Sequence, residues 1–101
     1  MNESKTAQIK SIVAKIDIEK INGYLQEHPK SETLRQIFGY RKRISDSSND
    51  QEIFNLSVRL AYDLDNICDP NKAGYVKDEK EKKHWLEISE ELFVNTKGAK
   101  K

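Results

Sequence analysis

The segment from residue 53 to residue 67 restricts the fold of this chain more than any other. Large apolar residues recur there at intervals of three and four positions: Ile53, Leu56, Leu60, Leu64 and Ile67. This spacing places all of them on one face of an α-helix, whereas a strand would bring alternate residues to the same face. Other segments repeat the pattern, and no alternating β pattern lies between the two prolines and four glycines. We therefore expect an all-α protein.

The first helical segment, residues 4–28, changes phase in its middle. Its first apolar stripe is Ile9, Ile12, Val13 and Ile16, but Ile18 falls on the opposite side of a regular helix. Asp17 has the side chain to cap a new helix at that point. The segment is therefore either two short helices or one helix kinked near Asp17, and it ends before Pro29 because a residue preceding proline avoids the α region.

Three further helices complete the predicted fold, an antiparallel four-helix bundle formed by a single domain over residues 1–101. The second helix begins near Ser31, where Thr33 and Gln36 have the spacing of a capping box. The third lies between caps at Asn49 and Asp69-Pro70. The fourth opens near Asp78 and ends at Gly98. Residues 96–101 are expected to be a flexible tail.

The charges of the chain are separated along the sequence, although the net charge is only +1. The segment from Lys30 to Arg43 has five basic residues and one acidic residue, and the segment from Asp46 to Asp69 has six acids and one arginine. We expect the basic helix to lie beside the acidic one and to pair with acids such as Asp63 and Asp65. A chain without an apolar run of 18 residues, a secretion signal or a second cysteine is expected in the cytoplasm.

No arrangement of residues in the sequence indicates catalysis. Glu81, His84 and Glu87 form a Glu-x-x-His-x-x-Glu motif, but a di-iron bundle needs a second such motif. We interpret the motif as a solvated helix face and expect no metal or cofactor. Cys68 lacks a suggested histidine partner and is interpreted as a structural thiol. Trp85 lies on the apolar stripe of the fourth helix, which favours a core position over a partner-binding one.

One basic cluster suggests an alternative function in nucleic-acid binding. It consists of Arg35, Tyr40, Arg41, Lys42 and Arg43, which combine phosphate-binding cations with an aromatic ring on which a base can stack. The near-neutral net charge argues against this function. We therefore expect no specific nucleic-acid binding, and a contact with a membrane surface or an acidic partner is a comparable alternative.

Three stretches together resemble the immunity proteins that protect lactic acid bacteria and streptococci from pediocin-like (class IIa) bacteriocins. The first is residues 31–39, Ser-Glu-Thr-Leu-Arg-Gln-Ile-Phe-Gly. The second is Leu56-Ser57 with the amphipathic helix that runs to Asn66-Ile67. The third is the link from Lys72 to Val76, followed by a Lys-rich helix that carries Leu86, Glu87, Ile88 and Ser89. Their order and spacing resemble those of the family over residues 5–95.

The resemblance implies a four-helix bundle without enzyme activity, located in the cytoplasm, with a peripheral position at the inner membrane face as an alternative. It implies that the protein recognises a mannose phosphotransferase permease, the membrane receptor, once a bacteriocin has engaged it. Specificity in the family lies mainly in the C-terminal half. The residues that this implies for partner binding are Lys72, Tyr75, Lys83, Lys97, Lys100 and Lys101. The chain departs from the family in its Lys-rich end and in the phase break at Asp17.

Overall fold

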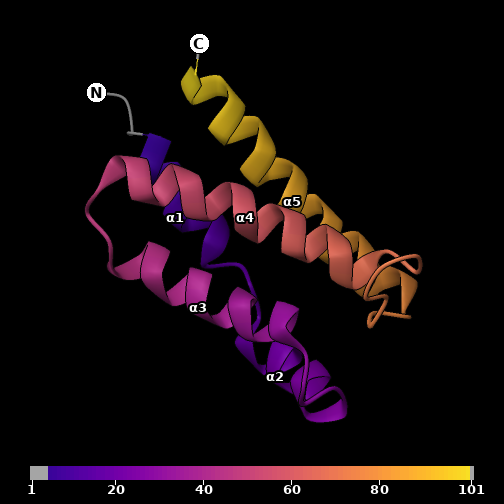
Figure 1. Ribbon diagram of the computed structural model, residues 1–101. Coiled ribbons are helices and arrows are strands. Elements are labelled where there is room, and N and C mark those ends of the chain that lie inside the picture. Colours follow the sequence, from indigo (N-terminus) through magenta and orange to yellow (C-terminus); the bar gives the residue numbers. More distant parts are fainter. Residues whose placement is uncertain (1–4, 101) are drawn as a thin grey trace.

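The computed structural model describes the backbone of residues 5–100 and the side chains of residues 5–96. This part of the chain is all-α and contains no strand. The helices, in chain order, are α1 (Lys5–Val13), α2 (Ile18–Glu27), α3 (Glu32–Asp46), α4 (Asp50–Cys68) and α5 (Glu79–Lys100). The described residues thus form five helices rather than the four that the sequence predicted (Figure 1).

The additional helix results from the phase break at Asp17, and of the two alternatives the structure has two short helices. The Asp17 carboxylate accepts hydrogen bonds from the backbone N–H groups of Glu19 (3.0 Å) and Lys20 (3.3 Å), which caps α2. The break lets both apolar phases face the interior, since Ile16 before it is 2% exposed and Ile21 after it is fully buried. One straight helix would have left one of these phases in water.

Side chains at the predicted positions cap α4 and α5, whereas the prediction for α3 was wrong. Asn49 accepts a hydrogen bond from the backbone N–H of Glu52 (2.9 Å), and Asp78 accepts from that of Glu81 (3.1 Å). The capping box at Thr33 was wrong, because Ser31 is the N-cap of α3 and accepts from the backbone N–H of Leu34 (3.1 Å). Thr33 instead lies in the first turn of α3.

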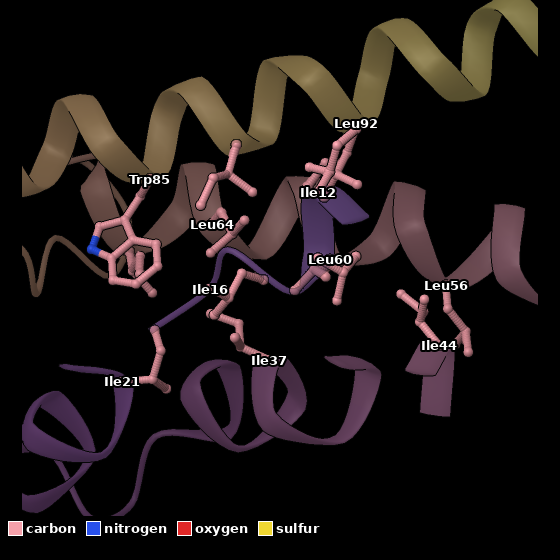
Figure 2. Packing of buried hydrophobic residues seen from close by; sticks show 14 of the residues in the cluster. Ile12, Ile16, Ile21, Ile37, Ile44, Leu56, Leu60, Leu64, Trp85 and Leu92 are labelled. Atoms are coloured by element: carbon pink, nitrogen blue, oxygen red, sulfur yellow. The ribbon is translucent and has the colours of Figure 1, made fainter. Parts of the chain in front are cut away.

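Every helix contributes side chains to one hydrophobic core. Figure 2 shows from close by how these side chains pack. The stripe predicted in α4 is buried along its length: Leu60 and Leu64 are fully buried and Leu56 is 6% exposed. Trp85 is also fully buried, which confirms the core position predicted for it. The largest fully buried side chains are Trp85, Ile9, Ile16, Ile21, Leu34, Ile37, Ile44, Ile53, Leu60, Leu64, Ile67 and Leu92.

Helices α4 and α5 lie side by side and form the longest packed pair of the fold (Figure 1). Small residues allow their close approach: the hydroxyl of Ser89, 1% exposed, donates a 3.0 Å hydrogen bond to the backbone carbonyl of Ala61. No helix of the described chain is long and apolar enough to cross a membrane.

The C-terminal end of α5 differs from the sequence prediction. The helix does not stop at Gly98 but continues to Lys100. Thr96, assigned to the flexible tail, is 4% exposed, and its hydroxyl donates to the backbone carbonyl of Leu92 (2.9 Å). Thr96 therefore belongs to the folded part of the chain. The rest of the predicted tail lies where side chains, and at Lys101 also the backbone, are outside the described residues.

Candidate functional site

The link between α4 and α5 folds back onto the end of α4. The backbone N–H of Gly74 donates to the carbonyl of Asn66 (3.2 Å), and that of Val76 donates to the carbonyl of Ile67 (3.0 Å). Gly74 has a φ of 58°, and a Cβ atom there would meet the Pro70 Cα at 3.0 Å. This position therefore requires glycine. Because Val76 is also buried, the link is held in one shape.

Tyr75 connects the link to the turn between α2 and α3. Its ring stacks on His28, with centroids 4.1 Å apart and an angle of 24° between the planes. Tyr75 is half-buried, and the two rings line a shallow hollow with Pro29, Lys30 and Ser31. A residue predicted for partner binding thus also joins two distant segments of the chain.

A network of polar and aromatic side chains joins α2 to the beginning of α5. The Tyr24 hydroxyl donates to the Glu81 carboxylate and accepts a 3.1 Å hydrogen bond from the Trp85 indole N–H. Lys20 forms a 3.3 Å ion pair with the same carboxylate. The pKa of Tyr24 is raised well above its ordinary value. Burial of the phenol is the largest cause, and the hydrogen bond to Glu81 is the second. The phenol therefore stays protonated, and the network joins two helices.

These contacts separate the members of the Glu-x-x-His-x-x-Glu motif. Glu81 is bound to Tyr24 and Lys20, and the His84 ring lies against Trp85 at a centroid distance of 4.7 Å. Glu87 is exposed. Within the part of the chain that the structure describes, no three His, Cys, Asp or Glu side chains are grouped so as to hold a metal ion.

Cys68 has the environment of a structural thiol. It is 5% exposed, and its Sγ lies 3.9 Å from the Lys82 backbone carbonyl, to which the thiol donates. Burial, reinforced by the charge of Asp65, raises the pKa of Cys68 to about 11. A nucleophilic cysteine needs a lowered pKa, because the thiolate is the reactive form. The structure therefore offers no activation of this thiol.

Two of the lysines predicted for partner binding are placed on the surface. Lys72 is exposed in the link, and Lys83 is exposed on α5. The backbone of Lys97 and Lys100 is helical, but their side chains lie outside the described residues, as does Lys101 altogether.

The predicted basic cluster is not one surface, because its members point in different directions around α3. Arg35 donates to the carbonyl of Pro29 (2.7 Å), which ties it to the preceding turn. Lys42 pairs with Asp46 at 3.2 Å on the same helix, and Arg43 pairs with Glu52 of α4 at 3.2 Å. The half-buried Tyr40 lines one hollow with Arg43, whereas Arg41 and Lys42 line a second hollow, so the cluster is divided between two parts of the surface. The basic helix thus pairs with the acidic one, but not through Asp63 or Asp65 as predicted.

The dispersal of these cations leads to a prediction on nucleic acids. We expect only weak binding, because two cations already have carboxylate partners and the others do not converge on one phosphate track. Fluorescence anisotropy with single- and double-stranded oligonucleotides at physiological salt measures this. Micromolar affinity that is lost in the double variant Arg41→Glu, Arg43→Glu would contradict the prediction.

Asp63 of α4 is a half-buried acid whose Oδ2 atom has no hydrogen-bond partner in the described chain. Burial raises the pKa of Asp63 to about 6 from its ordinary 3.8. A raised carboxyl pKa means that the charged form destabilises the folded state. This penalty is absent below pH 4 and grows as the pH rises from about 4 to about 6.

We therefore expect Asp63→Asn to stabilise the protein above pH 7, by about 1–2 kcal/mol after allowance for solvent screening. The advantage should disappear below pH 4, where the native carboxyl is neutral. Urea unfolding between pH 3 and pH 8 measures both limits. A variant that is less stable than the parent at pH 8 would show that Asp63 has a favourable partner.

Comparison with protein-family models, with curated proteins and with solved structures finds no match to this chain. A function for this chain must therefore be argued from its own residues. Sequence reasoning missed the exposed apolar side chains Tyr62 and Val94, which are 59% and 61% exposed. The sequence pattern could have identified both residues as exposed, because they lie off the apolar stripes of their helices.

Proposed function

We propose that this chain is a non-catalytic immunity protein. In this proposal it protects a bacterial cell from a class IIa bacteriocin by binding the toxin-engaged receptor, a mannose phosphotransferase permease, from the cytoplasmic side. The observation that carries the proposal is the placement of the three stretches behind the resemblance. Residues 31–39 open α3 at its Ser31 cap, residues 56–67 form the buried stripe of α4, and residues 72–76 form the held link.

The order of the helices supports the same proposal. If α1 and α2 are counted as one helix interrupted at Asp17, then α3, α4 and α5 complete a four-helix arrangement. This is the fold that the family resemblance implies. The interruption is then a local feature of this chain, produced by the Asp17 cap.

The C-terminal half offers the proposed contact surface. Lys72 and Lys83 are exposed there, and the backbone around Lys72 is held by the hydrogen bonds of the link. A held link presents its side chains in one geometry, which lowers the entropic cost of binding a partner. Exposed lysines are also suited to the anionic inner leaflet, which allows a peripheral membrane contact.

The expected result is protection of sensitive cells that express the full chain, seen as a smaller inhibition zone around one or more class IIa bacteriocins. Exchanging residues 70–101 for those of an immunity protein with another specificity should move protection to that protein's toxin. Truncation after Thr96 should leave the fold intact, because the buried Thr96 is retained. The melting temperature of each purified variant provides the control for folding.

Two results would count against parts of this proposal. If the folded full chain protects against no class IIa toxin in a broad panel, the immunity function is wrong. If protection survives the exchange of residues 70–101 with unchanged specificity, the recognition surface lies in α1, α2 or α3 instead.

A further inference from the structure

The outer side of the α4–α5 pair has an apolar strip that remains largely open to solvent, although one of its members, Phe93, also packs against the core. We call Tyr62, Leu86, Phe93 and Val94 the seam strip. Tyr62, Leu86 and Val94 are 59%, 43% and 61% exposed, and they are the large hydrophobic side chains most exposed in the described chain. Tyr62 and the half-buried Phe93 meet edge to face across the two helices, with ring centroids 5.1 Å apart. The strip is therefore one surface shared by α4 and α5.

Two hollows extend from this strip. One contains Tyr62 and Leu86, passes Asp65, and continues to Pro70 and Lys72 at the beginning of the link. The other surrounds Val94 with Glu87, Glu90 and Glu91. Along α5, Leu86, Glu90 and Val94 follow one another at intervals of four residues and share a face. This face is about 12 Å long, or a little over two helical turns.

Carboxylates border the seam strip, and several have no ion-pair partner among the described side chains. Glu91 is occupied, because it forms a 3.2 Å ion pair with Lys15 of α1. Asp65, Glu87 and Glu90 form no ion pair with any described side chain. Among the described cations, Arg59 lies one turn before Tyr62 on α4, Lys72 lines a hollow with Tyr62, and Lys83 lies one turn before Glu87 on α5. None of the three forms an ion pair with these acids. The strip is thus apolar in its centre and carries unpaired negative charge along its border.

We propose that the seam strip binds a basic amphipathic helix of a protein partner. Exposed apolar side chains spaced over about two turns fit the i, i+3, i+4 and i+7 anchors of such a helix. Lysines or arginines beside those anchors would reach Asp65, Glu87 and Glu90, which supplies the charge complementarity that selects a partner. This inference rests on the proposed function, for which it names the class of segment recognised within the receptor–toxin complex.

The charges make other occupants less suitable. The three unpaired carboxylates would repel an anionic lipid surface laid over the seam strip, so a membrane contact through Lys72 or Lys83 would lie beside the strip and not on it. A second copy of this chain, docked symmetrically through the same surface, would bring the carboxylates of both copies together. A basic helix avoids both costs, because it replaces water around these acids with opposite charges.

The test uses fluorescently labelled peptides of about 16 residues, in which leucines at helical spacing form one face and lysines the other. Anisotropy is measured with the full chain at low and physiological salt. A peptide with the same composition in scrambled order, and one with glutamate in place of lysine, are the probes for comparison. We expect the Leu/Lys helix to bind about tenfold more tightly than the scrambled peptide and the Leu/Glu helix not to bind.

Variants of the protein locate the binding surface. The double variant Glu87→Lys, Glu90→Lys and the single variant Leu86→Ser should each weaken binding about tenfold. Glu27→Lys with Glu32→Lys makes the same charge change at two exposed positions of α2 and α3, and it should leave binding within about twofold. Thermal melts verify that each variant is folded, which is expected because all these side chains are exposed.

Several outcomes would overturn the inference. Equal binding of the ordered and scrambled peptides, or equal loss in the control double variant, would mean that net charge alone attracts the peptide. A stable dimer in sedimentation that Leu86→Ser abolishes would assign the strip to a second copy. Binding to anionic vesicles that requires Leu86 would assign it to lipid. Protection of cells without peptide binding would overturn this inference alone, whereas peptide binding without protection would overturn the proposed function alone.

Discussion

Replacing Leu60 by alanine is expected to lower the free energy of unfolding by about 2–5 kcal/mol, one of the two largest losses that a single truncation should cause here. Leu60 is fully buried in the middle of α4, where Figure 2 shows its side chain in the packed core. Truncation removes apolar contacts and leaves a cavity that rigid helices on several sides cannot close. Since about 1 kcal/mol shifts the melting temperature of a domain of this size by about 4–8 °C, the expected shift exceeds 8 °C.

The matched control for this variant is Leu86→Ala on the neighbouring helix. The chemical change is the same, but Leu86 is 43% exposed. Truncation there should cost less than about 1 kcal/mol, because little apolar area returns to water and no cavity forms. Circular dichroism melts and urea unfolding measure both variants. Equal losses of unfolding free energy in the two variants would show that Leu60 of α4 does not contribute to the core as the structure indicates.

Replacing Trp85 by alanine is expected to cost about 3–5 kcal/mol, the usual range for a large buried aromatic residue. Trp85 is fully buried, and its ring lies edge to face with Tyr24 at a centroid distance of 6.3 Å. The variant also loses the hydrogen bond from the indole N–H to the Tyr24 hydroxyl. Because a small domain has only about 5–15 kcal/mol of stability, this variant is expected to lose a large part of it.

Trp85→Phe and Tyr24→Phe separate packing from hydrogen bonding. Trp85→Phe keeps an aromatic ring in the core and should lose less than the alanine variant. Tyr24→Phe removes the hydroxyl that joins Trp85 and Glu81, with an expected cost of about 1–3 kcal/mol for the buried N–H left unpaired. Chemical unfolding followed by circular dichroism ranks the three variants. A Trp85→Ala protein as stable as the parent would place the tryptophan outside the core.

The existence of the helices could be predicted from the sequence because it depends on local spacing. The positions of Leu56, Leu60 and Leu64 follow the helical period, and all are buried in the structure. Hydrogen bonds between near neighbours are local in the same way, which is why Asp17, Asn49 and Asp78 were correctly identified as caps. Ser31 and Thr33 offered two nearby hydroxyls to the same helix start, and the pattern alone selected the wrong one.

The partners of charged side chains could not be predicted in this way. Local charge predicted that α3 and α4 lie together, and Arg43 does pair with Glu52. It also suggested Asp63 as a partner, yet that carboxylate is half-buried with one oxygen unpaired among the described residues. The choice depends on how far each helix rotates about its axis when the apolar stripes pack. That rotation is set by all the contacts in the core rather than by the charges themselves.

The sequence by itself therefore determined the helical class, the position of the break at Asp17 and most of the buried residues. Each of these depends on residues within about four positions of one another along the chain. Only the tertiary structure decided that Tyr75 stacks on His28, that Tyr24 forms a hydrogen bond to Glu81, and that Tyr62 meets Phe93 in the seam strip. These pairs are far apart in sequence, and they meet because burial of the common core fixes the relative positions of the helices.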